Sequence, residues 1–387
     1  MKKPAEHVLS VTSHGGLPGF EALEDDWRRL TAADNRYWIQ YRFFRELIRH
    51  SLHGAGSIFC LALRDHDSRI AAIVPLRETL VPVRRLAFRC AELLGSTFDD
   101  VTCQASSAGF PLAGTVAPRD VLRAVQAELR RRNGAPPSLL LLGRLCANSP
   151  ELRGALEISG QSQPHVSMGG YKWLDVSRDF SAVHGALAGK FRISLRSCRR
   201  NLAALGTVER KIITPRDNGF SEEFETFLSI ESSGWKGTSG TATGLLVNTV
   251  PNQRKFLRAI AEEMDVGCPE IHSLTLNGRP IAAQFWLRFR STRVAFKIGY
   301  LEEFARFQPG HLLVEDIVRM SCEDPTLTAI DFVSDAPWLD KWRVSFEAHH
   351  HHYLPVKSTA GAFADLLLRL PSAEQLRRRI GLPSGAG

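Results

Sequence analysis

The stretch AFKIGYLEEFARFQPGHLLVEDIV, residues 295–318, is the most informative part of this chain of 387 residues. It begins as an apolar strand, turns at 308–310 (QPG) and continues with the spacing of a helix. The first turn of a helix leaves N–H groups without partners, and the helix dipole attracts negative charge to them. Arg306 lies in the same loop and His311 directly follows it. We therefore predict an anion site at this turn, with a pyrophosphate as its ligand; a plain helix start without ligand is the alternative.

The elements around this turn predict an α+β fold with a mixed sheet. Asn277-Gly278 between two apolar runs is the strongest short-range signal for a β-hairpin. From the spacing we expect helices at 118–132, 179–205, 221–233, 251–264 and 310–322, and strands at 57–64, 69–76, 137–145, 271–276, 280–289, 293–300 and 327–333. We divide the chain into a first domain at 1–165, a second at 166–357 and a tail at 358–387.

The composition is that of an ordinary globular protein with an excess of positive charge. The net charge of +8, from 49 basic and 41 acidic side chains, fits a nucleic-acid binder or a pocket for a polyphosphate or another anion. The seven cysteines are scattered and form no C-x-x-C pair, which excludes a zinc ribbon and argues against a disulfide framework. Because the start lacks an apolar signal-peptide core and no apolar run is long enough to span a bilayer, we expect a cytoplasmic protein.

A basic stripe is predicted on the helix at 179–205. Arg192, Arg196 and Arg200 recur every four residues, and Arg199 lies on the same face. Guanidinium groups bind phosphate in a bidentate manner. No acidic residue follows the first position of this helix, so we expect the arginines to lack local partners. We favour a phosphate-binding face, to which Arg192 and Arg196 contribute, over a merely solvated one.

The loop after the helix at 221–233 contains further candidate groups. Glu231 precedes a glycine-rich segment that includes Trp235 and Lys236. Glycines allow close approach of the backbone to a ligand, the indole offers a flat apolar wall and the lysine a cation. A flexible connector is the alternative interpretation.

Asp331 lies inside the apolar strand at 327–333, where an unpaired carboxylate is costly. It should therefore meet a cation, and Lys297 on a neighbouring predicted strand is our candidate. A structural ion pair and a catalytic one are equally compatible with the sequence.

Two segments near the end of the chain suggest other kinds of site. Four consecutive histidines at 349–352 lie in a predicted strand, where alternate side chains face opposite ways, and we predict no metal site there. The tail at 358–387 is basic and amphipathic, which is typical of a docked terminal helix or of peripheral contact with a membrane.

Five stretches together resemble the CelD-like acetyltransferases, which are named for cellulose biosynthesis and belong to the GNAT superfamily, close to the Fem-type aminoacyl transferases. In chain order the stretches are LAGKFRISLRSCRRNLAALG, FLSIESSGWKGTSGTAT, LNGRPIAAQFWL, AFKIGYLEEFARFQPGHLL and IDFVSDAPWLDKW. The resemblance covers 170–350 closely and 20–165 more loosely. The chain departs from it at Leu301, where the family often has Asp, and at Val333, where a glycine is usual in a DFG-like turn.

The resemblance implies two GNAT-like acyltransferase domains in tandem and direct acyl transfer from acetyl-CoA or another acyl-CoA to an amine. It implies a pyrophosphate site formed by Arg306, Gln308, Gly310 and His311. Around the reacting centre we expect Glu231, Lys297, Tyr300 and Asp331 as catalytic residues and Trp235, Lys236, Gln284 and Asp335 as acceptor-binding residues. Glu231 or Asp331 would accept the proton, and Lys297 or backbone N–H groups would face the oxyanion.

The sequence thus predicts an acyl-CoA-dependent N-acyltransferase that acts on a small molecule or on an envelope or exopolysaccharide precursor. A Fem-like transferase that uses aminoacyl-tRNA is one alternative, and only that one would require nucleic acid. A non-catalytic accessory protein of exopolysaccharide biosynthesis is the other alternative, and it would not bind acetyl-CoA.

Overall fold

The computed structural model describes residues 9–50, 57–96, 108–132, 136–233, 251–262, 267–356 and 358–370. Within these ranges one 12-stranded mixed sheet has the order β1-β2-β3-β4-β5-β12-β6-β11-β10-β9-β8-β7. The first half of the chain contributes β1 (Ser10–Gly15), α1 (Gly16–Glu21), α2 (Glu24–Thr31), the 3₁₀ helix η1 (Tyr37–Ile39), α3 (Tyr41–His50), β2 (Ile58–Arg64), β3 (Ile70–Val83), β4 (Leu86–Leu93), α4 (Pro118–Arg131), β5 (Leu139–Cys146) and α5 (Pro150–Ser159).

The second half contributes all the remaining strands of the sheet and the helices around them. Its elements are β6 (Val166–Asp175), α6 (Phe180–Gly185), α7 (Gly189–Ala203), β7 (Val208–Ile213), α8 (Phe220–Glu231), α9 (Pro251–Ala261), β8 (Cys268–Leu276), β9 (Arg279–Phe289), β10 (Thr292–Tyr300), η4 (Glu302–Phe307), α10 (Pro309–Glu323), β11 (Ala329–Asp331), η5 (Pro337–Trp342), β12 (Ser345–Pro355) and α11 (Thr359–Arg369).

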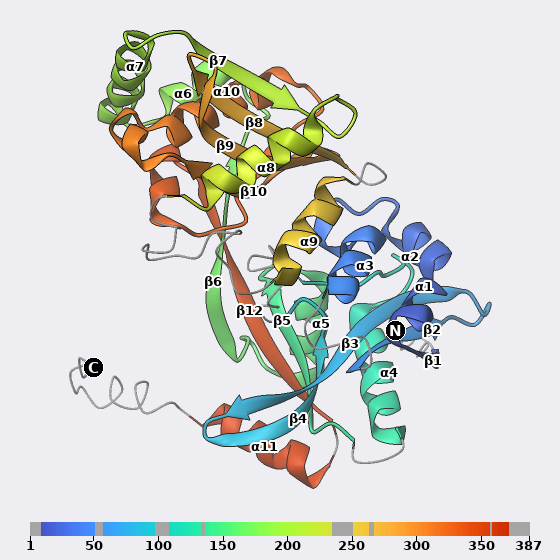
Figure 1. The fold of residues 1–387 in the computed structure, drawn as a ribbon. Coiled ribbons are helices and arrows are strands. Elements are labelled where there is room, and N and C mark those ends of the chain that lie inside the picture. The colour runs from blue at the N-terminus through green and yellow to red at the C-terminus, as the bar shows by residue number, and fades with distance from the viewer. Residues whose placement is uncertain are drawn as a thin grey trace, which may run out of the picture.

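The last strand of the chain joins the two halves. β12 pairs antiparallel with β5 of the first half on one side and with β6 on the other. Figure 1 shows β6 and β12 running from one lobe of the molecule to the other. The two halves therefore share one continuous hydrogen-bonded sheet.

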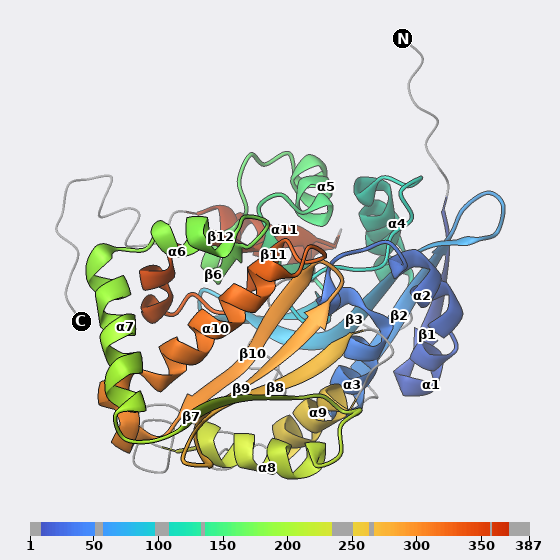
Figure 2. The same ribbon diagram turned by 90° about the horizontal axis from the view of Figure 1, so that it is seen from above.

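Strand β9 shows how the sequence places two cores on the two faces of the second half. Successive side chains of a strand point to opposite faces. Phe285 and Leu287 accordingly pack with α3, α8 and α9, whereas Trp286 between them packs with α7 and α10. In Figure 2 α10 and α8 lie on opposite sides of β8, β9 and β10. The first half thus helps to cover one face of the second.

The predicted hairpin is confirmed, and the prediction of one long helix at 179–205 is wrong. β8 and β9 pair antiparallel around Asn277-Gly278, and both turn residues have positive φ, as this turn requires. In place of one helix there are two, α6 and α7. Ala188 between them is extended (φ −57, ψ 135), and the poor helix former Gly189 follows it.

The histidine run lies in β12, but it does not alternate as expected. Register shifts occur against β6 at Ala348/His349 and against β5 at His350/His352. Bulges of this kind break the period of two, so His349, His351 and His352 are all buried. In the part of the chain that the structure describes, the only group of three potential metal-ligating residues is the turn at 65–67, outside this run.

These histidines should make the protein sensitive to acid. Burial lowers the pKa of His349 to about 3, of His351 to about 4 and of His352 to about 3. As the pH falls from about 6.5 towards 4, the unfolded chain takes up protons that the folded chain does not. The free energy of unfolding should therefore fall, by up to about 1.4 kcal/mol per pH unit for each buried histidine.

Urea unfolding at pH 7, 6 and 5 measures this loss. His351→Gln should flatten the pH dependence, while His66→Gln, at an exposed histidine, should leave it unchanged. Equal slopes in all three proteins would contradict the burial of His351.

Helix α11 begins the predicted tail. Ala364 packs in a small core with Leu139 and Leu141, while Phe363 and Leu366 are exposed. The arginines at 377–379 lie outside the described residues. No helix within those described is both long and apolar enough to cross a bilayer.

Candidate functional site

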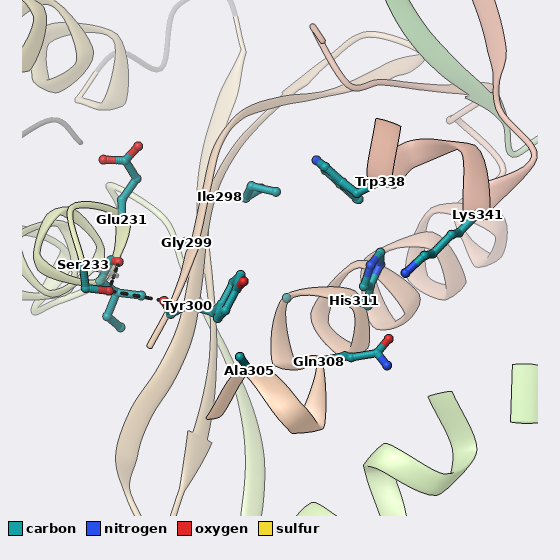
Figure 3. A pocket seen from close by; sticks show the side chains of 12 residues that line it. Glu231, Ser233, Ile298, Gly299, Tyr300, Ala305, Gln308, His311, Trp338 and Lys341 are labelled. Atoms are coloured by element: carbon teal, nitrogen blue, oxygen red, sulfur yellow. Dashed lines mark hydrogen bonds between the residues drawn. The ribbon is translucent and has the colours of Figure 1, made fainter. Parts of the chain in front are cut away.

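A cavity of about 450 Å³ lies beside the end of β10. Its walls come from the end of α8, the end of β10, the turn into α10 and the helix η5, as Figure 3 shows. The lining residues are Ile230, Glu231, Ser233, Ile298, Gly299, Tyr300, Ala305, Gln308, Gly310, His311, Trp338 and Lys341. The turn that the sequence singled out therefore borders an open cavity.

The start of α10 provides a main-chain donor to this cavity. Gln308 is in the left-handed region (φ 49), and its carbonyl accepts the N–H groups of His311 and Leu312. Pro309 has no N–H. Among the described residues the N–H of Gly310 has no partner, and no side chain caps this end of the helix. The helix dipole and this N–H group together favour an anion here.

Side chains hold the turn in place from two sides. Gln284 is fully buried; its Nε2 donates to the carbonyl of Gly310 (3.0 Å), and its Oε1 accepts from Trp286 (3.0 Å). Gln308 Nε2 donates to Ser194 Oγ on α7 (3.0 Å), and its buried Oε1 has no partner. Gln308 thus has one buried acceptor that makes no hydrogen bond, whereas Gln284 positions the turn without lining the cavity.

The arginine stripe only partly matches the prediction. Arg199 is not without partners: it forms ion pairs with Glu315 and Asp316 of α10, each at 2.8 Å. These partners are far away in the sequence, so the lack of acidic residues within 179–205 did not indicate them. Arg192 and Arg196 have no ion pair within the described ranges, and neither lines the cavity. Their role in binding a cofactor stays a prediction.

His311 is a neutral hydrogen-bond donor at the cavity. Its ring lies 5.3 Å from that of Phe191 and 5.4 Å from that of Trp338. Trp342 Nε1 donates to His311 Nδ1 (3.2 Å), so the ring hydrogen is on Nε2. Burial, and then the charge of Lys341, lower the pKa of His311 to about 4. At neutral pH the residue therefore offers an N–H group without a charge.

Glu231 and Tyr300 also belong to the lining of the cavity. Figure 3 places Glu231 and Ser233 on one side of β10 and His311 and Lys341 on the other. Glu231, the last residue of α8, is 2% exposed. Burial and the charge of Glu302 raise the pKa of Tyr300, which keeps its hydroxyl protonated at neutral pH.

Several predicted residues lie elsewhere. Trp235 and Lys236 are outside the described residues. Arg306 is exposed, and neither Lys297 nor Asp335 lines the cavity. Asp331 lines a second, smaller cavity. The parallel register pairs it with Val294, not Lys297, so the ion pair of Asp331 with Lys297 stays a prediction.

Trp338 and Lys341 were missed, although both lie in the quoted stretch IDFVSDAPWLDKW. The signal was a lysine and a tryptophan three residues apart, which is the spacing of one helical face. This spacing alone did not place Trp338 and Lys341 at the site, because the sequence does not show that η5 folds back over the start of α10.

The turn after β11 keeps its shape despite lacking glycine. Val333 has φ 55, in the left-handed region that β-branched residues rarely occupy. Its N–H donates to Asp331 Oδ1 (2.7 Å), and its side chain is buried. A strained residue of this kind, next to a buried carboxylate, is typical of a functional region.

Comparison with known proteins agrees with this geometry. Residues 189–343 match the acetyltransferase (GNAT) domain. This part of the chain is a GNAT domain. All residues that line the larger cavity fall within the matched range, and the protein is an acyltransferase.

The fold of the GNAT domain and of the rest of the chain is shared with solved structures. The crystal structure of FemX is 11% identical, with a TM-score of 0.56, and the match covers 89% of this chain and 98% of that one. A conserved protein of unknown function from Bacteroides thetaiotaomicron is also 11% identical, with a TM-score of 0.52 and coverage of 89% and 99%.

A tandem GNAT protein from the clavulanic acid biosynthesis pathway is 10% identical, with a TM-score of 0.48 and coverage of 91% and 100%. No protein of curated function matched by sequence. The prediction of a mixed sheet that carries a GNAT domain is confirmed.

Proposed function

We propose that this acyltransferase takes its acyl group from a CoA thioester and transfers it to an amine. The observation that carries the proposal is the start of α10, whose unpartnered Gly310 N–H group borders the larger cavity. A phosphate group suits this position because of the helix dipole. Lys341 adds a positive charge, and the Nε2–H of His311 adds a neutral donor.

The other residues of the cavity wall suit the amide-rich arm of a CoA thioester. The Oε1 of Gln308, which has no partner in the structure, would accept a hydrogen bond from an amide group of this arm after a small rotation of the side chain. Tyr300 and Trp338 supply apolar and aromatic surface on the same cavity. Acyl-CoA would supply the activated acyl group, and the chain's own residues would bind and orient it.

The transfer forms a C–N bond and breaks a C–S bond, and the sulfur leaves as a thiol after taking up a proton. The attacking nitrogen must lose its proton, and Glu231, a buried residue of the cavity lining, would accept it. Tyr300, which stays protonated, would donate towards the leaving sulfur. Holding both reactants in one cavity contributes the rest of the rate through orientation.

Glu231→Gln should lower kcat by about 100- to 10,000-fold and leave the Kd for acetyl-CoA within about threefold of wild type, because a lost general base affects the transfer step and not phosphate binding. Calorimetry with acetyl-CoA and thiol release in the presence of primary amines measure the two quantities. Glu222→Gln, at an exposed position on the same helix, is the control.

Wild-type protein that binds no acetyl-CoA would contradict the proposed function and favour an accessory protein. Unchanged turnover in Glu231→Gln would instead remove only the role of Glu231.

The acceptor that we propose from the resemblance is a small molecule or an envelope or exopolysaccharide precursor.

An aminoacyl-tRNA donor is the second candidate. Arg192, Arg196 and Arg200 on α7 have no acidic partner among the described residues, which favours it, and FemX shares the fold. RNA binding through such a stripe would weaken steeply with salt, by roughly one power of the salt concentration per phosphate contact. Filter binding of aminoacyl-tRNA at 50 and 200 mM salt tests it, and salt-independent or absent binding would remove this candidate.

A further inference from the structure

Helix α11 has no polar side, yet it lies at the surface of the molecule. Asp365 and Arg369 are the only charged residues in this helix, and they form an ion pair with each other (2.8 Å). One side of the helix packs through Ala364 against Leu139 and Leu141. A helix that is apolar all round is normally buried all round. The open side of α11 therefore calls for a partner.

This open side carries large apolar side chains. Phe363, Leu366 and Leu370 follow one another at spacings of three and four residues, which places them along one side of the helix. Leu86 on β4 lies on the same face of the β3–β4 hairpin as Phe88, whose ring centroid is 6.4 Å from that of Phe363. These four residues other than Phe88 are between 47% and 55% exposed. We call them the α11 patch.

The tip of the β3–β4 hairpin holds α11 in place and brings positive charge to the patch. Arg84 is in the left-handed region (φ 59) where the chain turns between the two strands. Its Nε donates to the carbonyl of Leu367 (3.0 Å) and its Nη2 to that of Leu370 (2.6 Å), at the end of the helix. Arg85 follows it in the turn and is exposed. The apolar patch and the basic hairpin tip thus form one surface.

The charge of this part of the chain is positive even when every acidic residue in it is counted. The hairpin segment 78–89 has three arginines and one acidic residue, and the segment 358–387 has four arginines and two acidic residues. This excess does not depend on which arginines form ion pairs. An exposed apolar helix face beside excess positive charge is the chemistry by which proteins bind bilayers that contain anionic lipids.

Two other partners suit the charge less well. A symmetric dimer uses the same surface on both subunits, so the arginines of two copies would come close to one another. The segment 371–387 of this chain has three arginines and one acidic residue, the same sign of charge as the hairpin tip. Both partners would bring like charges together, whereas an anionic bilayer brings opposite charges together.

We propose that the α11 patch and the tip of the β3–β4 hairpin bind the surface of a bilayer that contains anionic lipids. The apolar side chains enter the boundary between head groups and acyl chains, and the arginines contact the lipid phosphates. Figure 1 shows α11 and this hairpin at the end of the molecule opposite α7 and α10. The larger cavity, beside the start of α10, stays clear of the bilayer in this orientation. The proposal does not depend on the reaction that the protein catalyses.

Co-sedimentation of the full chain with lipid vesicles tests the proposal. Vesicles of phosphatidylcholine with about 30% phosphatidylglycerol should bind the protein at least about tenfold more tightly than phosphatidylcholine alone. Leu366→Asp should weaken binding to the anionic vesicles at least about tenfold, because a carboxylate replaces an apolar contact. Arg85→Glu should weaken it by about 10- to 30-fold, because it reverses one charge at the bilayer surface.

Ile193→Asp is the matched control. Ile193 is also an exposed apolar residue beside arginines, but it lies on α7, at the other end of the molecule. This variant should bind the anionic vesicles within about twofold of wild type. Leu366→Asp and Arg85→Glu change exposed side chains, so both should unfold at the wild-type urea concentration.

Absence of binding of the wild type to the anionic vesicles would overturn the proposal, and so would equal binding of wild type, Leu366→Asp and Arg85→Glu. Loss of binding in Ile193→Asp would place the contact on α7 instead. Sedimentation velocity without lipid covers the second copy: a dimer that Leu366→Asp dissociates would assign the patch to that copy. Vesicle binding that appears only in Leu376→Asp would assign the patch to the segment 371–387. Each of these results would overturn the proposal.

Discussion

Gly310→Asp is expected to raise the Kd for acetyl-CoA by at least about 100-fold. The new carboxylate would lie in the first turn of α10, at the cavity where we place the phosphates. Like charges about 4–6 Å apart repel by roughly 3 kcal/mol at an effective dielectric constant of 20, which corresponds to about 100-fold in affinity. The helix should still form, because an acidic side chain in the first turn is favourable to the helix dipole.

Gly310→Ala is the matched control. A Cβ atom at this position would meet only Tyr300 Cδ1, at the ordinary contact distance of 3.5 Å. The alanine variant should therefore bind acetyl-CoA within about threefold of wild type. Calorimetry on both variants measures the effect, and equal affinity of Gly310→Asp and wild type would show that no phosphate binds at this turn.

Gly299→Ala is expected to destabilise the protein by about 1–3 kcal/mol and to remove most of its transfer activity. The added Cβ would lie 2.5 Å from Glu231 Cα and 2.8 Å from Glu231 N. Both are backbone atoms, so the end of α8 must shift. This shift would also move Glu231 and break the hydrogen bond from Ser233 Oγ to the carbonyl of Tyr300 (3.2 Å).

The control for this prediction is Gly189→Ala at the start of α7. Nothing lies within 4 Å of a Cβ there, so the substitution should be neutral or stabilise the fold by up to about 1 kcal/mol. Urea unfolding and thiol release measure stability and activity. If Gly299→Ala unfolded at the wild-type urea concentration, α8 would not press against β10 as the structure shows.

Local sequence signals correctly predicted the elements whose ends are set by characteristic turn or helix-start residues. The hairpin at Asn277-Gly278 and the start of α10 at Pro309 are examples, because their backbone geometry depends on only a few adjacent residues. Glu231, Tyr300, Gln308, Gly310 and His311, all named from the sequence, border one cavity.

The predictions were less accurate where the position or the contacts of a residue depend on residues far away in the sequence. The apolar stripe at 179–205 continued through a break at Ala188, so one helix was predicted where two occur. Arg199 found its acidic partners on α10, more than 100 residues later. Lys341 lines the larger cavity because η5 folds back over the start of α10, which the sequence does not show.

By itself, the sequence determined a helix start after an apolar strand, where we propose that an anion binds, because the groups involved are the main chain and a few adjacent residues. Only the tertiary structure decided that Asp331 lies apart from that cavity, in a ring of aromatic side chains from both halves. The physical reason is strand pairing: the register of β11 with β6 and β10 sets which side chains surround a carboxylate, and register depends on the whole sheet.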